Sequence, residues 1–345
     1  MSTTVSEDTF LELAQPLRRE LLAHCYRMVG SVHEAEDLVQ ETYLRAWRAF
    51  HGFENRSSVR TWMYRIATNT CLSALEGRAR RPLPAGLGAP PSDPEGELHQ
   101  RPEVPWLEPV PDEVLWGRPP DDPEAAVVDR ESVRLAFVAA LQHLTGQQRA
   151  VLVLRDVLAW HAQEVAEALD LSVGAVTSTL QRARNHLARV QAATAPPAPL
   201  PADDPRVAEL LEAYVDAFEH YDVERIVSLL TADAVWDMPP YTDWYVGAED
   251  IGRLISTQCP ASGPESMRML ATRANGSPAF GLYMLAPDGV HRAFQLQHVT
   301  VTQGGVAAVT AFFDTRLFRV FGLPDELPRE DLPAEVVRAV GVRHD

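Results

Sequence analysis

The sequence predicts a multidomain protein with two all-α helical domains followed by a C-terminal α+β cone. A chain of 345 residues exceeds what one hydrophobic core usually organises. Two Pro-rich stretches, 80–124 and 193–205, divide the chain, because proline breaks helices and is excluded from central strands. Apolar residues follow the helical period before the second stretch and the strand period after it. The predicted parts are, in order, residues 8–82, a Pro-rich acidic linker 83–124, residues 125–191 and residues 205–345.

The composition excludes several classes of protein. The three cysteines, Cys25, Cys71 and Cys259, are scattered, which indicates a reducing compartment rather than a disulfide framework. No Cys or His cluster has the spacing of a zinc site, so we expect no metal and no cofactor. The N-terminus lacks the features of a signal peptide, and no apolar run reaches the ~20 residues that span a bilayer. We therefore expect a cytoplasmic protein without membrane contact.

The charge of the chain is unevenly distributed. The formal net charge is −17, and every one of the 31 basic residues is arginine. Residues 1–82 and residues 131–190 each carry a net charge of +1, whereas residues 83–130 carry −8 and residues 191–345 carry −11. Acidic protein repels DNA, so only the two nearly neutral helical segments are suited to approach it.

The first helical domain contains a strongly amphipathic segment, 31–52, which Ser31 or His33 opens and Gly52 closes. Its apolar residues recur with a period near 3.6, and its other face is polar. A solvated charged face and a partner-binding face fit this pattern equally well. A second helix is predicted over 61–81, with Trp62 near its start and an arginine cluster at its end.

The segment 164–184 has the pattern of a helix-turn-helix. Asp170 lies in the turn, where a left-handed conformation is required, and aspartate tolerates it better than most residues. Ser172 is predicted to cap the second helix, whose residues Val176, Leu180, Ala183 and Leu187 face inward. The outward residues are small or able to pair with bases and phosphates, which indicates DNA reading in the major groove rather than an ordinary helical hairpin. The candidates for contacts with bases and phosphates are Ser172, Gly174, Ala175, Thr177, Ser178, Gln181, Arg182 and Arg184.

The C-terminal part begins with two predicted helices, 205–220 and 222–231, and continues with short alternating segments typical of strands. Turn signals at 287–289 and 303–305 predict hairpins between them. Helices followed by a meander predict an α+β cone around one sheet.

Taken together, EAEDLVQETYLRAWRAF, RTWMYRIATNTCLSAL and the segment from His143 to Arg184 resemble regions 2 and 4 of bacterial σ factors of the extracytoplasmic function group. The resemblance covers 8–82 and 125–191, and it implies that core RNA polymerase and promoter DNA are the partners. Region 2 of such factors docks on the β′ clamp helices, and the matching positions here are Asp37, Gln40, Glu41 and Arg45.

The same resemblance implies that region 2 melts the −10 element and holds unstacked bases. Single-stranded DNA is bound by aromatic stacking and by cations on its backbone. The candidates for −10 DNA are Arg56, Arg60, Trp62, Tyr64, Arg65, Asn69, Arg78 and Arg80. Packing in a helix core is the alternative for Trp62. Region 4 would bind the −35 element and the β flap, and the linker, with Trp106 and Trp116, would thread toward the RNA exit channel.

The C-terminal part resembles a SnoaL-like domain of the NTF2-like cone fold. The resemblance implies a fused regulator that acts through a small ligand or through an intramolecular contact. Its pocket candidates are Asp237, Tyr241, Trp244 and His298. No paired constellation of acid and base is visible, so we expect no catalytic residue and no enzyme.

The sequence therefore predicts a σ factor that directs core polymerase to promoters and promotes −10 melting, with a C-terminal domain that modulates its activity. Two alternatives stay open at this stage. One is a ligand-responsive helix-turn-helix regulator, and the other is a SnoaL-type cyclase or isomerase with a DNA-binding appendage. A further hypothesis is that the acidic linker and C-terminal part lower non-specific DNA affinity.

Overall fold

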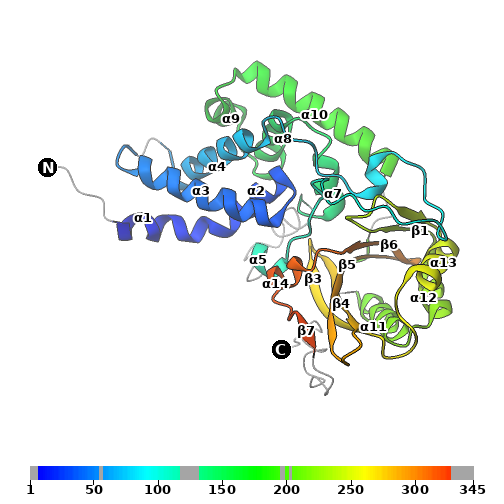
Figure 1. The fold of residues 1–345 in the computed structure, drawn as a ribbon. Helices are drawn as coiled ribbons and strands as arrows, with labels where there is room; N and C mark the ends of the chain where they lie inside the picture. Colours follow the sequence, from blue (N-terminus) through cyan, green and yellow to red (C-terminus); the bar gives the residue numbers. More distant parts are fainter. Residues whose placement is uncertain (1–6, 54–56, 117–131, 195–198, 202–203, 328–345) are drawn as a thin grey trace. The chain divides into compact units, whose positions relative to one another are not determined.

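The computed structural model describes residues 7–53, 57–116, 132–194, 199–201 and 204–327 (Figure 1). The chain forms two compact units, one from Met1–Arg81 with Leu107–Ala195 and one from Pro82–Trp106 with Pro196–Asp345. We call them the helical unit and the cone unit. The predicted linker is therefore not a single free segment, because it divides between the units at residues 106 and 107.

The N-terminal part of the helical unit is an antiparallel helix cluster. Its elements are α1 (Glu7–Ala14), the 3₁₀ turn η1 (Gln15–Leu17), α2 (Arg18–Val29), α3 (Val32–Phe50) and α4 (Val59–Leu75). The predicted cap is confirmed: the Ser31 hydroxyl accepts from the backbone N–H of Glu34 at 3.1 Å. Ser58 caps α4 in the same way, through the N–H of Thr61 at 3.0 Å.

The rest of the helical unit is built from α5 (Asp112–Trp116), α7 (Leu135–Leu141), α8 (Gly146–Leu152), a π turn η3 (Val153–Val157), α9 (Ala162–Leu169) and α10 (Val173–Thr194). Helix α8 contacts both α2 and α4, so the two predicted helical domains pack into one unit. Arg149 of α8 is buried and donates to the Met28 carbonyl and, at 2.9 Å, to Oε1 of Gln142. Because a buried guanidinium without partners is costly, these bonds fix α8 against α2.

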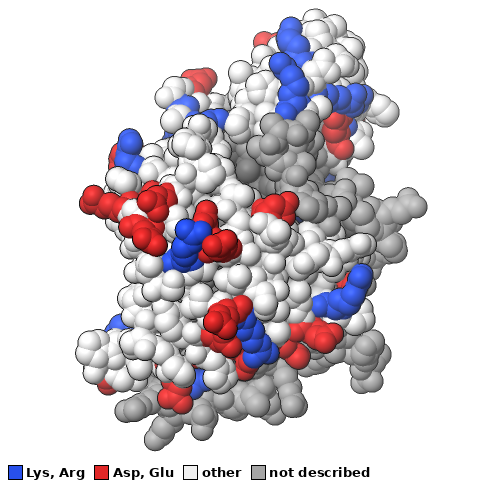
Figure 2. All heavy atoms as spheres, turned by 90° about the vertical axis from the view of Figure 1, so that its right-hand side faces the viewer, with Lys and Arg blue, Asp and Glu red and all other residues white. Residues whose placement is uncertain are grey.

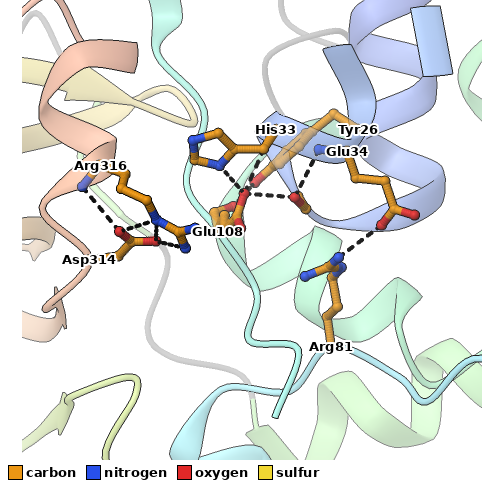
Figure 3. A network of polar contacts seen from close by, with 8 residues as sticks. Tyr26, His33, Glu34, Arg81, Glu108, Asp314 and Arg316 are labelled. Atoms are coloured by element: carbon orange, nitrogen blue, oxygen red, sulfur yellow. Dashed lines mark hydrogen bonds and ion pairs between the residues drawn. The ribbon is translucent and has the colours of Figure 1, made fainter. Parts of the chain in front are cut away.

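The second half of the predicted linker is clamped to α2 and α3 by Glu108. Its carboxylate accepts from the Ser31 hydroxyl at 2.7 Å and pairs with His33 Nδ1 at 3.0 Å (Figure 3). Its carbonyl accepts from the Tyr26 hydroxyl at 2.8 Å. Burial alone would raise the pKa of Glu108, but the bonds from His33 and Ser31 hold that pKa below its usual value. The carboxylate therefore remains ionised and holds the segment in place.

A glycine makes the close approach of this segment feasible. Gly30 ends α2 with a φ of +74°, and the N–H of Glu108 donates to its carbonyl at 3.0 Å. A Cβ added at Gly30 would lie 2.8 Å from Leu107 Cδ1, so no larger residue fits there without movement. Leu107 is fully buried as a result.

The cone unit contains one sheet of β1 (Leu230–Asp237), β2 (Trp244–Val246), β3 (Met267–Ala274), β4 (Ser277–Leu285), β5 (His291–Thr302), β6 (Gly305–Phe312) and β7 (Glu326–Leu327). The strand order is β2-β1-β6-β5-β4-β3, with β7 beside β5. Helices α11 (Pro205–Glu219), α12 (Val223–Leu229) and α13 (Ala248–Gln258) contribute to its core, and α14 (Arg316–Val320) follows β6 (Figure 1). The α+β cone and its two leading helices are thus confirmed.

Three details differ from the expected meander. Strand β1 pairs with β6 in parallel, because the chain between them is long enough for a crossover. Helix α13 was not predicted. The apolar pattern of residues 306–318 predicts one strand, but the strand ends at Phe312 and α14 begins at Arg316. Strand periodicity identifies the strands but not their partners.

Residues 82–106, which we call the strap, belong to the cone unit. The strap runs along the segment from β1 to β2. The N–H of Ser92 donates to the Trp244 carbonyl and the N–H of Arg101 to the Pro240 carbonyl, both at 2.8 Å. The first half of the predicted linker is therefore fixed by backbone hydrogen bonds to the cone. Among the described residues, no helix is long and apolar enough to cross a membrane.

Candidate nucleic-acid interface

The polar face of α3 is available for a partner within the helical unit. Asp37, Gln40 and Arg45 are exposed, and Glu41 accepts from Arg45 Nε at 2.7 Å. Leu44, which the sequence pattern did not indicate, lies among them and is 51% exposed. Leu44 and the charged residues beside it share one exposed side of α3. We call these five residues the α3 face.

One side of α4 presents the candidates for −10 DNA. Trp62, Arg65 and Asn69 recur at helical spacing; Arg65 and Asn69 are exposed and Trp62 is half-buried. The ring of Trp62 packs on Phe53, with 4.8 Å between the ring centroids, as the packing alternative predicts. Contact of Trp62 with −10 DNA stays a prediction. Arg56 lies outside the described residues.

The prediction that Tyr64 stacks on a base is wrong for this structure. Tyr64 is only 1% exposed, and its ring meets Trp160 edge-on with 6.1 Å between centroids. Arg60 is exposed, but its Nε donates to Glu20 at 2.7 Å, and its guanidinium lies 5.0 Å from the Tyr64 ring. Tyr64 therefore packs between α4 and Trp160, and this burial raises the pKa of its hydroxyl.

The arginines that follow α4 lie on the surface but have partners. Arg78 forms an ion pair with Glu34, and Arg81 donates to the same carboxylate at 2.8 Å (Figure 3). Arg80 contacts His143 Nδ1 at 2.9 Å. Burial, together with the nearby Arg80 charge, lowers the pKa of His143. Arg78 and Arg80 are exposed, so a phosphate could replace these contacts at low cost.

The geometry of the helix-turn-helix agrees with its sequence. Asp170 has φ +54° and ψ +50°, the left-handed conformation predicted for the turn. The Ser172 hydroxyl accepts from the N–H of Ala175 at 3.1 Å, which confirms the predicted cap. The inward-facing residues of α10 are buried as expected: Val176, Leu180, Ala183 and Leu187.

The outward face of α10 contains the candidates for −35 DNA, and we call it the recognition face. All of them are exposed except Ala175, which is partly buried: Ser172, Gly174, Ala175, Thr177, Ser178, Gln181, Arg182 and Arg184. Arg184 forms a bidentate ion pair with Asp156 at 2.6 and 2.9 Å, so DNA must compete for it. Small residues at the start of the helix leave room for a close approach to a groove.

The cone unit contains a partly open cavity of about 270 Å³. Of the four pocket candidates, Tyr241 lines it, whereas Asp237, Trp244 and His298 are not among its lining residues. Alternation along β1 explains the difference, since Trp236 and Met238 line the cavity and Asp237 between them faces the other side. Asp237 Oδ1 accepts from the N–H of Ala85 at 2.7 Å.

Asp237 and Trp244 form hydrogen bonds with the strap instead of lining the cavity. Trp244 Nε1 donates to the Ala89 carbonyl at 3.1 Å. His298 is buried, and burial lowers its pKa to about 4. Among the described residues, no group of three His, Cys, Asp or Glu side chains could hold a metal ion.

Three protein-family models match separate parts of the chain. The model for σ70 region 2 matches residues 13–81, and the model for σ70 region 4 matches residues 134–187. The model for the SnoaL-like domain matches residues 211–309. The helix-turn-helix thus lies in the second match and the cavity largely in the third.

Relatives with the same organisation place the chain in a family. The ECF RNA polymerase sigma factor SigG of Mycobacterium tuberculosis is 58% identical over 313 residues, which is 91% of this chain and 83% of that protein. SigJ of the same species is 30% identical, over 86% of this chain and 88% of that protein. The crystal structure of SigJ superposes with a TM-score of 0.59 at 25% identity, covering 90% of this chain and 98% of that one. The chain belongs to the ECF RNA polymerase sigma factors.

Membership of the ECF sigma factor family decides between the three functions that the sequence left open. The protein is a transcription initiation factor that binds core RNA polymerase and promoter DNA, and it is not an enzyme. The repressor-like and cyclase-like alternatives are therefore set aside.

Proposed function

We propose that the recognition face of α10 reads the −35 element while α3 and α4 serve polymerase and the −10 element. The observation that supports this most directly is the exposed, capped helix-turn-helix with small residues at its start and arginine further along. Phosphate contacts position such a helix, and base contacts give it specificity. Region 4 would rest on the β flap in the same complex.

The α3 face is proposed to bind the β′ clamp helices. It combines an apolar side chain with charges of both signs, and interfaces gain affinity from a desolvated apolar centre with a polar rim. Leu44 would be that centre.

A charge placed at Leu44 is therefore expected to weaken polymerase binding. Leu44→Asp should lower the affinity for core polymerase at least about 10-fold, because a buried unpaired carboxylate costs several kcal/mol. Leu285→Asp is the matched control, since Leu285 is also an exposed leucine, 41% exposed, but lies on β4 of the cone unit. Affinity is measured by fluorescence anisotropy with labelled full-length protein. Equal losses in both variants would contradict the assignment.

The exposed side of α4 is proposed to hold the melted −10 strand. Stacking of a base on an aromatic ring contributes ~1–3 kcal/mol. Trp62→Ala should therefore weaken binding of a single-stranded −10 oligonucleotide by polymerase holoenzyme about 5-fold to 100-fold. Trp62→Phe should retain most of the affinity, because it keeps a ring on Phe53. Unchanged oligonucleotide affinity in Trp62→Ala would assign this residue to packing alone.

The cone unit is proposed to modulate activity through its acidity and the strap. On the face drawn in Figure 2, acidic side chains lie beside several of the arginines. Within the cone unit, Arg253 forms ion pairs with Glu249 and Asp250. Negative charge on the cone unit lowers the affinity of the chain for DNA, because it opposes the favourable release of counterions from the DNA.

Removal of the cone is expected to increase non-specific DNA affinity. A protein of residues 1–194, which ends with α10, should bind duplex DNA at low salt several-fold more tightly than the full chain. The difference should shrink as salt is added, because it is electrostatic. Equal affinities at low salt would remove the acidic-modulation hypothesis.

The proposed function is tested by run-off transcription with core polymerase on a promoter library. We expect transcripts only when both proteins are present, with common sequences upstream of the start sites at two separate positions. Transcripts that begin at random positions would contradict the proposal.

A further inference from the structure

The cavity of the cone unit has the lining of a binding site for an uncharged, mainly apolar molecule. Aromatic and aliphatic side chains form most of its wall, and none of its lining residues is charged. Phe218, Trp236, Phe294 and Phe313 contribute rings to it. Few polar groups in an apolar wall are typical of small-molecule sites.

One polar group in this wall has an unmet hydrogen bond. Gln295 lines the cavity and is only 7% exposed. Among the described residues, its Oε1 has no hydrogen-bond partner. A buried acceptor without a donor is unfavourable, so a ligand hydroxyl or N–H placed there would restore the missing hydrogen bond. The neighbouring Gln297 differs, because its Oε1 accepts from the Tyr214 hydroxyl at 2.8 Å.

The strap forms part of the same wall. Leu98 of the strap lines the cavity. Gln258 also lines it, and its Nε2 donates to the strap carbonyl of Gly96 at 3.0 Å. Tyr241 lines the cavity and pairs with Gln100 of the strap in a β-bridge. The cavity wall is therefore complete only while the strap is docked.

We propose that this cavity binds a neutral ring compound with a hydroxyl donor for Gln295, and that the bound ligand holds the strap on the cone. Leu98 contacts a ligand only in the docked state, so the ligand binds that state better and shifts the equilibrium toward it. This inference deepens the proposed modulation by the cone unit and rests on it.

The probe for the test is 2-naphthol, with naphthalene as the matched compound that lacks the hydroxyl. The full-length wild-type protein should bind 2-naphthol at least 5-fold more tightly than naphthalene. Gln295→Leu should remove that preference, because it removes the acceptor. Leu98→Ala should weaken 2-naphthol binding roughly 4-fold or more, since each lost methylene contact costs about 0.8 kcal/mol. Glu97→Gln, an exposed strap residue outside the wall, is the control and should bind like wild type.

Hydrogen exchange reports on the strap itself. At a 2-naphthol concentration 10 times its Kd, amide exchange at Ala85, Ser92, His99 and Arg101 should slow roughly 10-fold, because these N–H groups donate to the cone. No binding, binding equal in Leu98→Ala, or binding without slowed exchange at these amides would overturn the inference.

Neither measurement uses polymerase or promoter DNA. If the protein initiates transcripts but 2-naphthol does not slow amide exchange in the strap, only this inference is contradicted. If 2-naphthol slows that exchange but the protein never initiates a transcript, only the proposed function is contradicted.

Discussion

Gly174→Glu is expected to abolish transcription from promoters that depend on a −35 element, by about 100-fold or more. Gly174 lies at the start of the recognition face, where the carboxylate would meet phosphates and the groove floor. Like charges placed together in an interface cost several kcal/mol, and each 1.4 kcal/mol is a factor of ten. The fold should be unaffected, because a Cβ at this position has no atom within 4 Å. An acidic residue in the first turn of a helix even stabilises it by ~0.3–1 kcal/mol.

The matched control for this variant is Ala188→Glu. Ala188 is exposed on the same helix, roughly 20 Å further along at 1.5 Å per residue, and lies outside the recognition face. Run-off transcription and thermal unfolding are measured for both proteins. Full activity of Gly174→Glu, or an equal loss in Ala188→Glu, would show that this end of α10 does not meet DNA.

Asp237→Asn is expected to stabilise the protein, and to do so more at higher pH. Burial raises the pKa of Asp237 from 3.8 to about 6, although the N–H of Ala85 partly opposes the shift. Below pH 3.8 the carboxyl is protonated in both the folded and the unfolded state. As the pH rises to about 6, the unfolded state loses its proton first, so wild type progressively loses stability, by roughly 3 kcal/mol in all. Asparagine does not titrate, and its amide oxygen can still accept from Ala85.

The measurement is urea-induced unfolding of the full chain at pH 5 and at pH 7.5. The free energy of unfolding of Asp237→Asn should exceed that of wild type at both pH values, and the difference should be about 1.4 kcal/mol larger at pH 7.5 than at pH 5. Asp233→Asn removes the same charge from an exposed position on β1 and should show no such growth. An advantage that stays constant with pH would mean that Asp237 is not the group responsible.

Local signals explain why much of the helical part could be predicted from the sequence. Ser31, Ser172 and Asp170 act through hydrogen bonds and dihedral angles within a few residues, and all three behave as expected. The burial of Val176 and Leu180 likewise follows from the helical period.

Long-range contacts explain what the sequence did not show. Tyr64 looks like a stacking residue until Trp160, almost a hundred positions later, packs against its ring. Asp237 and Trp244 look like pocket residues in the sequence, but their polar groups form hydrogen bonds with the backbone of Ala85 and Ala89 in the strap. A Pro-rich composition correctly excludes long helices, yet it does not reveal that the segment docks on a sheet far along the chain.

Site-specific photo-cross-linking in the initiation complex tests whether α3 contacts β′ while α10 contacts promoter DNA. Cross-linkers are placed at Gln40 on the α3 face and at Ser178 on the recognition face, both exposed. We expect Gln40 to label β′ and Ser178 to label promoter DNA upstream of the −10 element, in the same preparation. A complex that initiates transcripts while Gln40 labels no β′, or while Ser178 labels no DNA, would contradict it.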